Sequence, residues 1–457
     1  MNTNENPLGT KPTNELLRQF AIPSIIAMLV TSLYNIVDQL FIGQAVGELG
    51  NAATNVCFPL TTLCISLALC FGIGSASSFN LAMGEGKKDI AGFYVGNAVT
   101  MMLIIGVALM AVVLLFKKPL LVVFGSPDEV LPYAMTYAGI TAFGFPACIL
   151  QAGGAHIIRA DGSPRITMLV NIVGAVINTV LDALFVFGFH MGIAGAAYAT
   201  IIGQYVSAVI VIIYLTRYKT VRLTKEVFIP KFRHILRVVS LGVGPFFNQI
   251  SFLVVQITLN NSLRHYGAIS KYGESIPIAV AGIVMKVTQV AGAFVIGVSQ
   301  GLQPIASFNY GAKKYSRVKA AYLLAIKYGA IICVIAFTIF QVFPRQILSA
   351  FGNGSDEYFE FGIRFMRVFI FCFIVFFMQP MSSNFFTAIG KPKMGVFMSL
   401  TRQIIFFVPL LIILPLFFGL DGIIYSGPAA DGTAFVVCLA LVLREFSHPE
   451  WKEISAY

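Results

Sequence analysis

The chain alternates between long apolar runs and short polar loops. Twelve of these runs are long enough to cross about 30 Å of hydrocarbon as helices that rise about 1.5 Å per residue. They lie near 15–41, 52–82, 91–116, 131–155, 166–189, 192–214, 235–262, 277–308, 316–341, 357–386, 394–418 and 420–444. We therefore predict an all-α polytopic membrane protein with twelve transmembrane helices.

Short motifs of the first half return in the second half in the same order. They are Ser78-Phe79-Asn80 with Ser307-Phe308-Asn309, Phe124-Gly125 with Phe351-Gly352, Asp128-Glu129 with Asp356-Glu357, and Ala160-x-Gly162-x-Pro164-Arg165 with Ala388-x-Gly390-x-Pro392-Lys393. The offsets stay between 227 and 229 positions, which indicates two homologous halves, a common build in secondary transporters. Because the shared Gly-x-Pro loops should face one side, each half should hold an even number of spans, hence six.

A polar stretch at 216–237 separates the halves and carries seven basic residues. We therefore predict a first lobe at 1–215 with helices 1–6, a cytoplasmic linker at 216–234, and a second lobe at 235–457 with helices 7–12. The composition agrees, because 57% of residues are hydrophobic and 11% charged, against about 25% charged in soluble domains.

Basic residues gather on one side of the predicted membrane. The termini and the loops after helices 2, 4, 6, 8 and 10 hold 21 Lys and Arg, and the opposite loops hold 5, among them Lys117 and Lys118. The positive-inside rule then places both termini in the cytoplasm of a multi-pass plasma-membrane protein. The net charge of +11 reflects this topology, and no soluble basic domain exists to bind nucleic acid. The segment before Leu16 lacks the pattern of a removable signal peptide, so helix 1 should remain.

Familiar enzyme and metal motifs are missing from the sequence. The seven cysteines form no Cys-x-x-Cys pair, and no His-Glu-x-x-His or Gly-x-Ser-x-Gly pattern occurs. We therefore expect neither disulfides, zinc nor a cofactor, and we do not expect an enzyme.

Charged side chains inside the bilayer are the candidates for function, because each costs at least about 2.5 kcal/mol unless it is paired or hydrated. Among the 20 acidic residues, only Asp38, Asp182 and Asp431 fall clearly within spans. Asp38 in helix 1 and Asp182 in helix 5 each lie roughly 10 Å below the outer surface.

Two neutral oxygen donors lie at a similar level. Asn178 precedes Asp182 by one helical turn and shares its face, and Thr200 in helix 6 lies roughly 12 Å deep. Such oxygens suit either a hard cation such as Na⁺ or a proton held on a desolvated carboxyl group. We interpret the four residues as a cation-coupling site, in which Asp38, Asn178 and Asp182 are metal ligands only if Na⁺ is the coupling ion. The alternative is that both aspartates stay protonated and hydrogen-bond to neighbouring helices.

The second half carries a different set of charges. Lys286 in helix 8 and Asp431 in helix 12 both lie roughly 15 Å below the outer surface, so we predict a buried ion pair, either structural or linked to substrate. Arg402 in helix 11 lies nearer the cytoplasm and belongs either to lipid headgroups or to an inner gate.

Helix 1 contains Pro23 about two turns from its start, which makes it a hinge candidate, although proline near a helix start is also simply tolerated. Aromatic residues make up 13% of the chain and Met contributes 15 residues. A cavity lined by such side chains would suit amphipathic organic cations.

These residues resemble a known family over essentially the whole chain. The matching motifs are Tyr34-Asn35-Ile36-Val37-Asp38-x-x-Phe41-Ile42-Gly43, Gly84-Glu85-Gly86-Lys87-Lys88 with Asn309-Tyr310-Gly311-Ala312-Lys313-Lys314, Arg159-Ala160-x-Gly162-x-Pro164, and Asn178-x-x-x-Asp182. Together they resemble the multidrug and toxic compound extrusion (MATE) family. The segment from Gly419 to Asp431, and the lack of acidic residues in the interior of helices 7, 8 and 10, are most similar to its prokaryotic MepA-like branch.

The resemblance implies two six-helix lobes around a central cleft, and an antiporter that exports cationic and amphipathic drugs by alternating access in exchange for H⁺ or Na⁺. It implies a cation site at Asp38, Asn178, Asp182 and Thr200, and a helix 1 that bends at Pro23. It makes a second-lobe cation site doubtful, and Asp431 cannot be assumed to replace one. We expect membrane lipids as neighbours and a monomer. The alternatives are a flippase for lipid-linked substrates of the same fold superfamily and a membrane scaffold or receptor.

Overall fold

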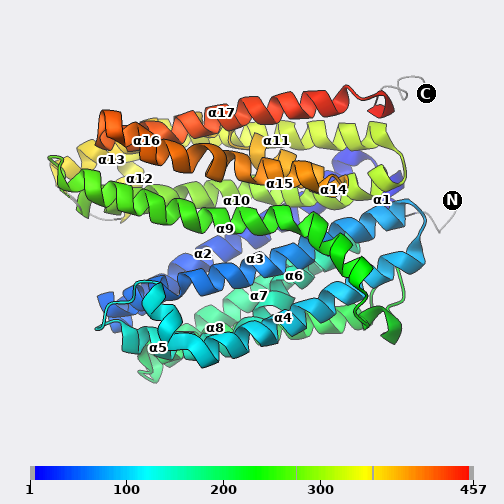
Figure 1. The fold of residues 1–457 in the computed structure, drawn as a ribbon, viewed down its shortest axis with the longest axis horizontal. Coiled ribbons are helices and arrows are strands. Elements are labelled where there is room, and N and C mark those ends of the chain that lie inside the picture. Colours follow the sequence, from blue (N-terminus) through cyan, green and yellow to red (C-terminus); the bar gives the residue numbers. More distant parts are fainter. Residues whose placement is uncertain (1–5, 274, 352–354, 452–457) are drawn as a thin grey trace.

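The computed structural model describes residues 6–273, 275–351 and 355–451, and the regular secondary structure in this part of the chain is helical. Eleven helices are long and apolar enough to cross a membrane, and a bent pair of shorter helices supplies a twelfth span. Figure 1 shows the spans running along the long axis of the molecule in two bundles. The predicted fold class of twelve transmembrane helices is confirmed.

The first lobe holds six spans. They are α2 (Thr13–Val46), α3 (Glu48–Gly84), α4 (Lys88–Val123), the pair α5 (Leu131–Thr141) and α6 (Phe145–Ala160), α7 (Pro164–Asp182) continued by the π-helix η2 (Ala183–Gly188), and α8 (Gly192–Thr216). The pair α5 and α6 is bent by 58° at the 3₁₀ turn η1 (Ala142–Gly144), which the apolar run at 131–155 did not predict.

The second lobe repeats this order with more breaks. It holds α9 (Phe232–Ala268), α10 (Ser275–Gly311), α11 (Tyr315–Val342), α12 (Pro344–Phe351), then α13 (Asp356–Phe369), η4 (Phe371–Val375) and α14 (Met378–Ala388) as one broken span, α15 (Pro392–Leu400), the π-helix η5 (Thr401–Phe407) and α16 (Val408–Phe418) as the next, and α17 (Leu420–Phe446).

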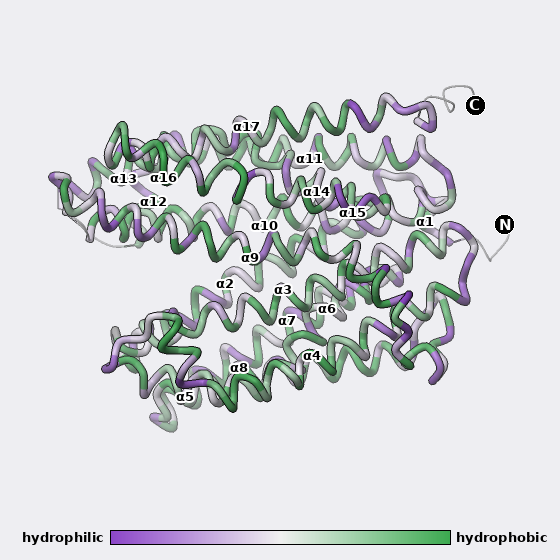
Figure 2. Tube along the Cα trace, in the orientation of Figure 1, coloured by the Kyte–Doolittle hydropathy of each residue, from purple (hydrophilic) through white to green (hydrophobic). Residues whose placement is uncertain are grey.

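Three short helices lie at one end of the bundles. They are α1 (Pro7–Thr10), η3 (Lys225–Phe228) in the linker, and η6 (Pro449–Trp451). This end, which we call the terminal side, carries both termini and the linker, and the opposite end is the far side (Figure 1). Hydrophilic segments gather at the two ends, and the spans between them are mostly hydrophobic (Figure 2).

The repeated Gly-x-Pro loops form the same turn in both lobes. Gly162 and Gly390 adopt the left-handed conformation, with φ of +79° and +75°. This conformation ends the preceding helix without the steric cost that a Cβ would bring. Pro164 and Pro392 then begin α7 and α15, where the missing N–H costs nothing. The repeat therefore encodes one turn that is used twice on the terminal side.

The lobes touch through reciprocal glycine contacts on the terminal side. A Cβ on Gly84 would lie 2.1 Å from the Phe308 carbonyl oxygen, and one on Gly311 would lie 2.2 Å from that of Leu81. Gly84 and Gly311 are 227 positions apart, and so are Leu81 and Phe308. Such mutual exchange of partners is what two-fold related units produce.

The hydrogen bonds that we find between the lobes in the described part of the chain also lie on the terminal side. Gln303 donates to Ser77 Oγ at 2.9 Å, and Asn309 donates to the Leu8 carbonyl at 2.9 Å. Tyr328 donates to Asn14 Oδ1 at 2.6 Å and accepts from Arg18. The lobes are thus joined through α1 and the terminal halves of α2 and α3, and they diverge toward the far side (Figure 1).

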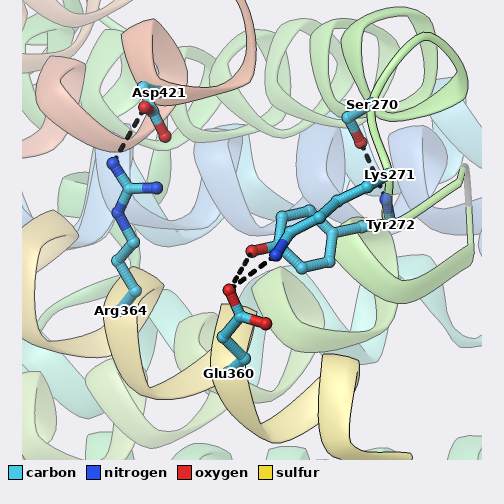
Figure 3. Close-up of polar contacts among 6 residues, drawn as sticks. All are labelled: Ser270, Lys271, Tyr272, Glu360, Arg364 and Asp421. Carbon is cyan, nitrogen blue, oxygen red and sulfur yellow. Dashed lines mark hydrogen bonds and ion pairs between the residues drawn. The ribbon is translucent and has the colours of Figure 1, made fainter.

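Polar contacts on the far side hold the second lobe to itself. Lys271 and the Tyr272 hydroxyl meet Glu360 of α13 at 2.7 and 3.0 Å, and Arg364 of α13 meets Asp421 of α17 at 2.8 Å (Figure 3). These pairs are exposed, so each contributes little stability alone. Together they connect three elements of the second lobe: α13, α17 and the loop that follows α9.

Candidate functional site

The four predicted cation ligands come from three neighbouring helices of the first lobe. Asp38 lies on α2, Asn178 and Asp182 end α7, and Thr200 lies on α8. α7 packs against both α2 and α8, which brings the three helices together. Asn178 and Asp182 are buried, and Asp38 and Thr200 are half-buried.

The side chains form a continuous cluster. The carboxyl groups of Asp38 and Asp182 face each other closely enough to interact directly. Asn178 lies one turn from Asp182 on the same face of α7. Its Nδ2 donates a hydrogen bond to Thr200 Oγ1 at 3.1 Å. The structure therefore brings together all four residues that the sequence places at one depth.

Four oxygens of this cluster are buried without a hydrogen-bond partner in the described structure. They are Asp38 Oδ1, Asn178 Oδ1, and both carboxyl oxygens of Asp182. An unsatisfied buried acceptor costs about 1–3 kcal/mol, and two facing carboxylates also repel each other. A proton or a small cation between these oxygens would remove both penalties.

The chemistry of the donors limits what can bind. Among the described residues, no three His, Cys, Asp or Glu side chains converge as they would around a transition metal. Two carboxyls, an amide and a hydroxyl are hard oxygen donors. The cluster therefore fits H⁺ or an alkali cation such as Na⁺.

The helix changes its winding directly after Asp182. The π-helical segment Ala183–Gly188 follows without a break and leads to the turn before α8. Single π turns within α-helices occur often at functional sites, because the wider turn redirects side chains. This segment ends at the far side, on the rim nearest the cluster.

Two tyrosines join the cluster that we did not assign from the sequence. Tyr34 lies one turn before Asp38 on α2 and close to Thr200, and Tyr137 of α5 lies near both carboxyl groups. The i,i+4 spacing of Tyr34 and Asp38 was a signal that could have been used. No comparable signal marks Tyr137, because its position depends on the bend between α5 and α6.

Pro23 lies within α2, which the structure shows as one helix from Thr13 to Val46. Its missing N–H leaves the Gln19 carbonyl without a helical partner. The residues on either side of Pro23 pack on the second lobe, because a Cβ on Gly301 or Gly297 of α10 would meet Ala21 or Ile25. The hinge candidate therefore lies at the lobe interface.

The predicted ion pair between Lys286 and Asp431 is wrong, because Asp431 pairs with Arg402 instead. Asp431 Oδ1 accepts a hydrogen bond from Arg402 Nε, and the side chains of Arg402 and Asp431 are 20% and 5% exposed. Lys286 is exposed on α10, and no ion pair joins it to Asp431 in the described structure. The equal depth of Lys286 and Asp431 did not show which way each side chain points around its helix axis. Arg402 and Asp431 lie on spans that pack against each other.

Lys286 lies on the face of α10 that turns toward the first lobe. It precedes Gly297 by 11 residues, which is about three turns at roughly 3.6 residues per turn, and Gly297 packs on Ile25 of α2. Lys286 is exposed because it lies on the far side of the Gly297 contact, where the two lobes diverge. Arg402, which the sequence left to headgroups or a gate, is the partner of Asp431 instead.

Comparison with known proteins gives the family. The MatE family model matches residues 23–184 and 247–413, one match in each lobe. The multidrug export protein MepA of Staphylococcus aureus (strain MSSA476) is 23% identical over 436 residues, which cover 94% of each chain. The probable multidrug resistance protein YoeA of Bacillus subtilis (strain 168) is 26% identical over 376 residues, 78% of each chain.

The fold is also shared with solved structures. A structure described as the outward-facing conformation of a multidrug resistance MATE family transporter superimposes with a TM-score of 0.90 at 23% identity. The match covers 98% of this chain and 99% of the other. The chain therefore belongs to the MatE family and is a multi-pass multidrug efflux transporter, not an enzyme.

Proposed function

We propose that this transporter exports cationic and amphipathic organic compounds in exchange for H⁺ or Na⁺, and that Asp38, Asn178, Asp182 and Thr200 bind the coupling ion. The observation that carries the proposal is the set of four buried oxygens without partners. They lie on three helices of a single chain, so the transporter needs no second copy to form the site, and we expect it to work as a monomer.

The orientation in the plasma membrane follows from charge. Most basic residues lie on the terminal side, so we assign that side to the cytoplasm. The lobes are closed there and diverge toward the far side, which corresponds to an outward-facing state. In this state the coupling ion would enter from outside, and drug would leave to the outside, in the opposite direction.

Coupling requires that the ion binds one conformation more tightly than another. Neutralising Asp38 and Asp182 removes their mutual repulsion and lets α2 move against α7. Because α2 also packs on α10 beside Pro23, movement of α2 would change the terminal-side closure. We therefore infer that Pro23 is the hinge that connects ion binding to reorientation of the lobes.

The test is efflux of ethidium from proteoliposomes under a pH gradient or a Na⁺ gradient, imposed separately. The gradient that drives efflux identifies the coupling ion. Asp38→Asn and Asp182→Asn should each abolish driven efflux, while Asp128→Asn, an exposed acid in a loop of the same lobe, should transport normally. Driven transport that persists in both site variants would refute the site assignment.

No efflux under either gradient, from folded wild type, would instead favour the flippase for lipid-linked substrates. Such a protein would need more basic charge in the cleft for its phosphates than Lys286 and Arg402 offer, and Arg402 is already paired. A membrane scaffold would show no flux of either kind.

A further inference from the structure

The second lobe contains a charged pair, Arg402 and Asp431, on the two spans that correspond to α7 and α8 of the first lobe. Gly192, Gly195 and Tyr198 of α8 return 227 positions later as Gly419, which directly precedes α17, and as Gly422 and Tyr425 of α17. Pro164 returns 228 positions later as Pro392. The span from α15 to α16 thus corresponds to α7, and α17 corresponds to α8. Arg402 and Asp431 lie on these equivalents.

The oxygen donors themselves are not repeated. With either offset, the equivalents of the three donors lack side-chain oxygens: Ile405 or Phe406 for Asn178, Pro409 or Leu410 for Asp182, and Gly427 or Pro428 for Thr200. Asp431 lies one turn beyond Gly427 and is buried. The other buried acidic residue of α17, Glu445, lies at the end of the helix and pairs with Lys391. The second lobe therefore has one carboxylate at nearly the level where the first lobe has its ion cluster.

This carboxylate already has a cation. Arg402 Nε donates to Asp431 Oδ1, and the guanidinium lies 5.2 Å from the ring centre of Phe376 and 5.8 Å from that of Phe407. Arg402 is held in the π-helical segment Thr401–Phe407, so each lobe has a π-helical turn beside its charged group. The other titratable groups near Asp431 are the thiols of Cys333 and Cys372.

We propose that Arg402 is a built-in cation that permanently occupies the second lobe, so that only the first lobe exchanges a coupling ion. A guanidinium stays protonated under physiological conditions, and stacking on aromatic faces favours it further. Asp431 is therefore neutralised by a group that cannot leave, whereas four oxygens of the first-lobe cluster have no partner among the described residues. The inference rests on the proposed function, because it fixes how many exchangeable ions the transporter carries.

The test counts exchangeable ions on purified protein, with ²²Na⁺ binding as the probe for sodium and the infrared band of protonated carboxyl groups as the probe for protons. Arg402→Gln frees Asp431 and should add one bound Na⁺ or one protonated carboxyl group per chain. The double variant Arg402→Gln/Asp431→Asn should lose this addition, and Arg402→Lys, which keeps the charge, should not gain it. Folded Arg402→Gln without any additional ion would overturn the proposal.

A second arm does not depend on the folding of Arg402 variants. Asp38→Asn/Asp182→Asn should leave no exchangeable ion, because Asp431 remains paired. An exchangeable ion that survives in this variant and disappears with Asp431→Asn would overturn the proposal. If the wild type binds no ion at all, the proposed function fails, and a gain in Arg402→Gln would still support the role of Arg402.

Discussion

Asn178 donates its amide N–H to Thr200 Oγ1 at 3.1 Å, and this leaves the Asn178 amide oxygen buried and without a partner. The hydrogen bond fixes which end of the amide faces the two carboxyl groups. It therefore converts a side chain that could point either way into an oxygen donor.

We expect Asn178→Ala to weaken coupling-ion binding about tenfold, which corresponds to roughly 1.4 kcal/mol for one lost oxygen ligand. Asn171→Ala is the matched control, because Asn171 lies two turns earlier on α7 and donates to the Thr167 carbonyl. The measurement is the concentration of Na⁺ or H⁺ that half-maximally stabilises the purified protein against heat. Equal shifts in both variants would mean that Asn178 is not a ligand.

Lys286 puts a positive charge on the α10 face that turns toward the first lobe. A positive charge on this face repels an organic cation that passes between the lobes. We expect Lys286→Gln to raise the efflux rate of ethidium a few-fold under the same gradient, and Lys286→Arg to leave it unchanged. An unchanged rate in Lys286→Gln would place this side chain away from the substrate path.

Arg317 fastens the N-terminal segment to the second lobe. Its guanidinium donates to the carbonyls of Leu8 and Lys11 and to Asn309 Oδ1. Removing these bonds should cost the closed terminal side about 1–3 kcal/mol. We expect Arg317→Ala to speed amide hydrogen exchange in Leu8–Lys11 and in the terminal halves of α2 and α10. Lys319→Ala, on the same helix but outside this contact, should exchange like the wild type.

Asp161 anchors the start of the linker to the first lobe. Its carboxyl group accepts hydrogen bonds from the backbone N–H groups of Lys219 and Thr220 and from the hydroxyls of Thr220 and Tyr214. Asp161→Ala would leave these donors without their acceptor. We expect it to lower the free energy of unfolding by about 1–3 kcal/mol, measured by thermal denaturation in lipid nanodiscs.

The same carboxyl group should make stability depend on pH. Burial raises the pKa of Asp161 above its ordinary value of 3.8, and the hydrogen bonds offset only part of this shift. The folded protein then binds this proton more tightly than the unfolded chain, so the contribution is most favourable below pH 3.8 and declines as the pH rises to the raised pKa. Asp161→Asn should abolish this decline, and Asp89→Asn, an exposed control, should retain it.

Much of the architecture was predictable because a membrane imposes a strict length and polarity on each span. All twelve predicted spans are present, and the repeated Gly-x-Pro loops form equivalent turns at Gly162 and Gly390. The bend between α5 and α6 and the break at η4 were not predictable, since an apolar run that is interrupted inside the bilayer has the same composition as a straight helix.

The sequence by itself determined how deep each polar residue lies, because depth follows from the number of residues to the end of a span. That was enough to group Asp38, Asn178, Asp182 and Thr200. Direction around each helix axis was decided only by tertiary packing, which adds Tyr137 to this cluster and gives Asp431 to Arg402 rather than to Lys286. The physical reason is that hydropathy depends on the position of a residue along a span, whereas ion pairs and ligand sets depend on which faces of different helices meet.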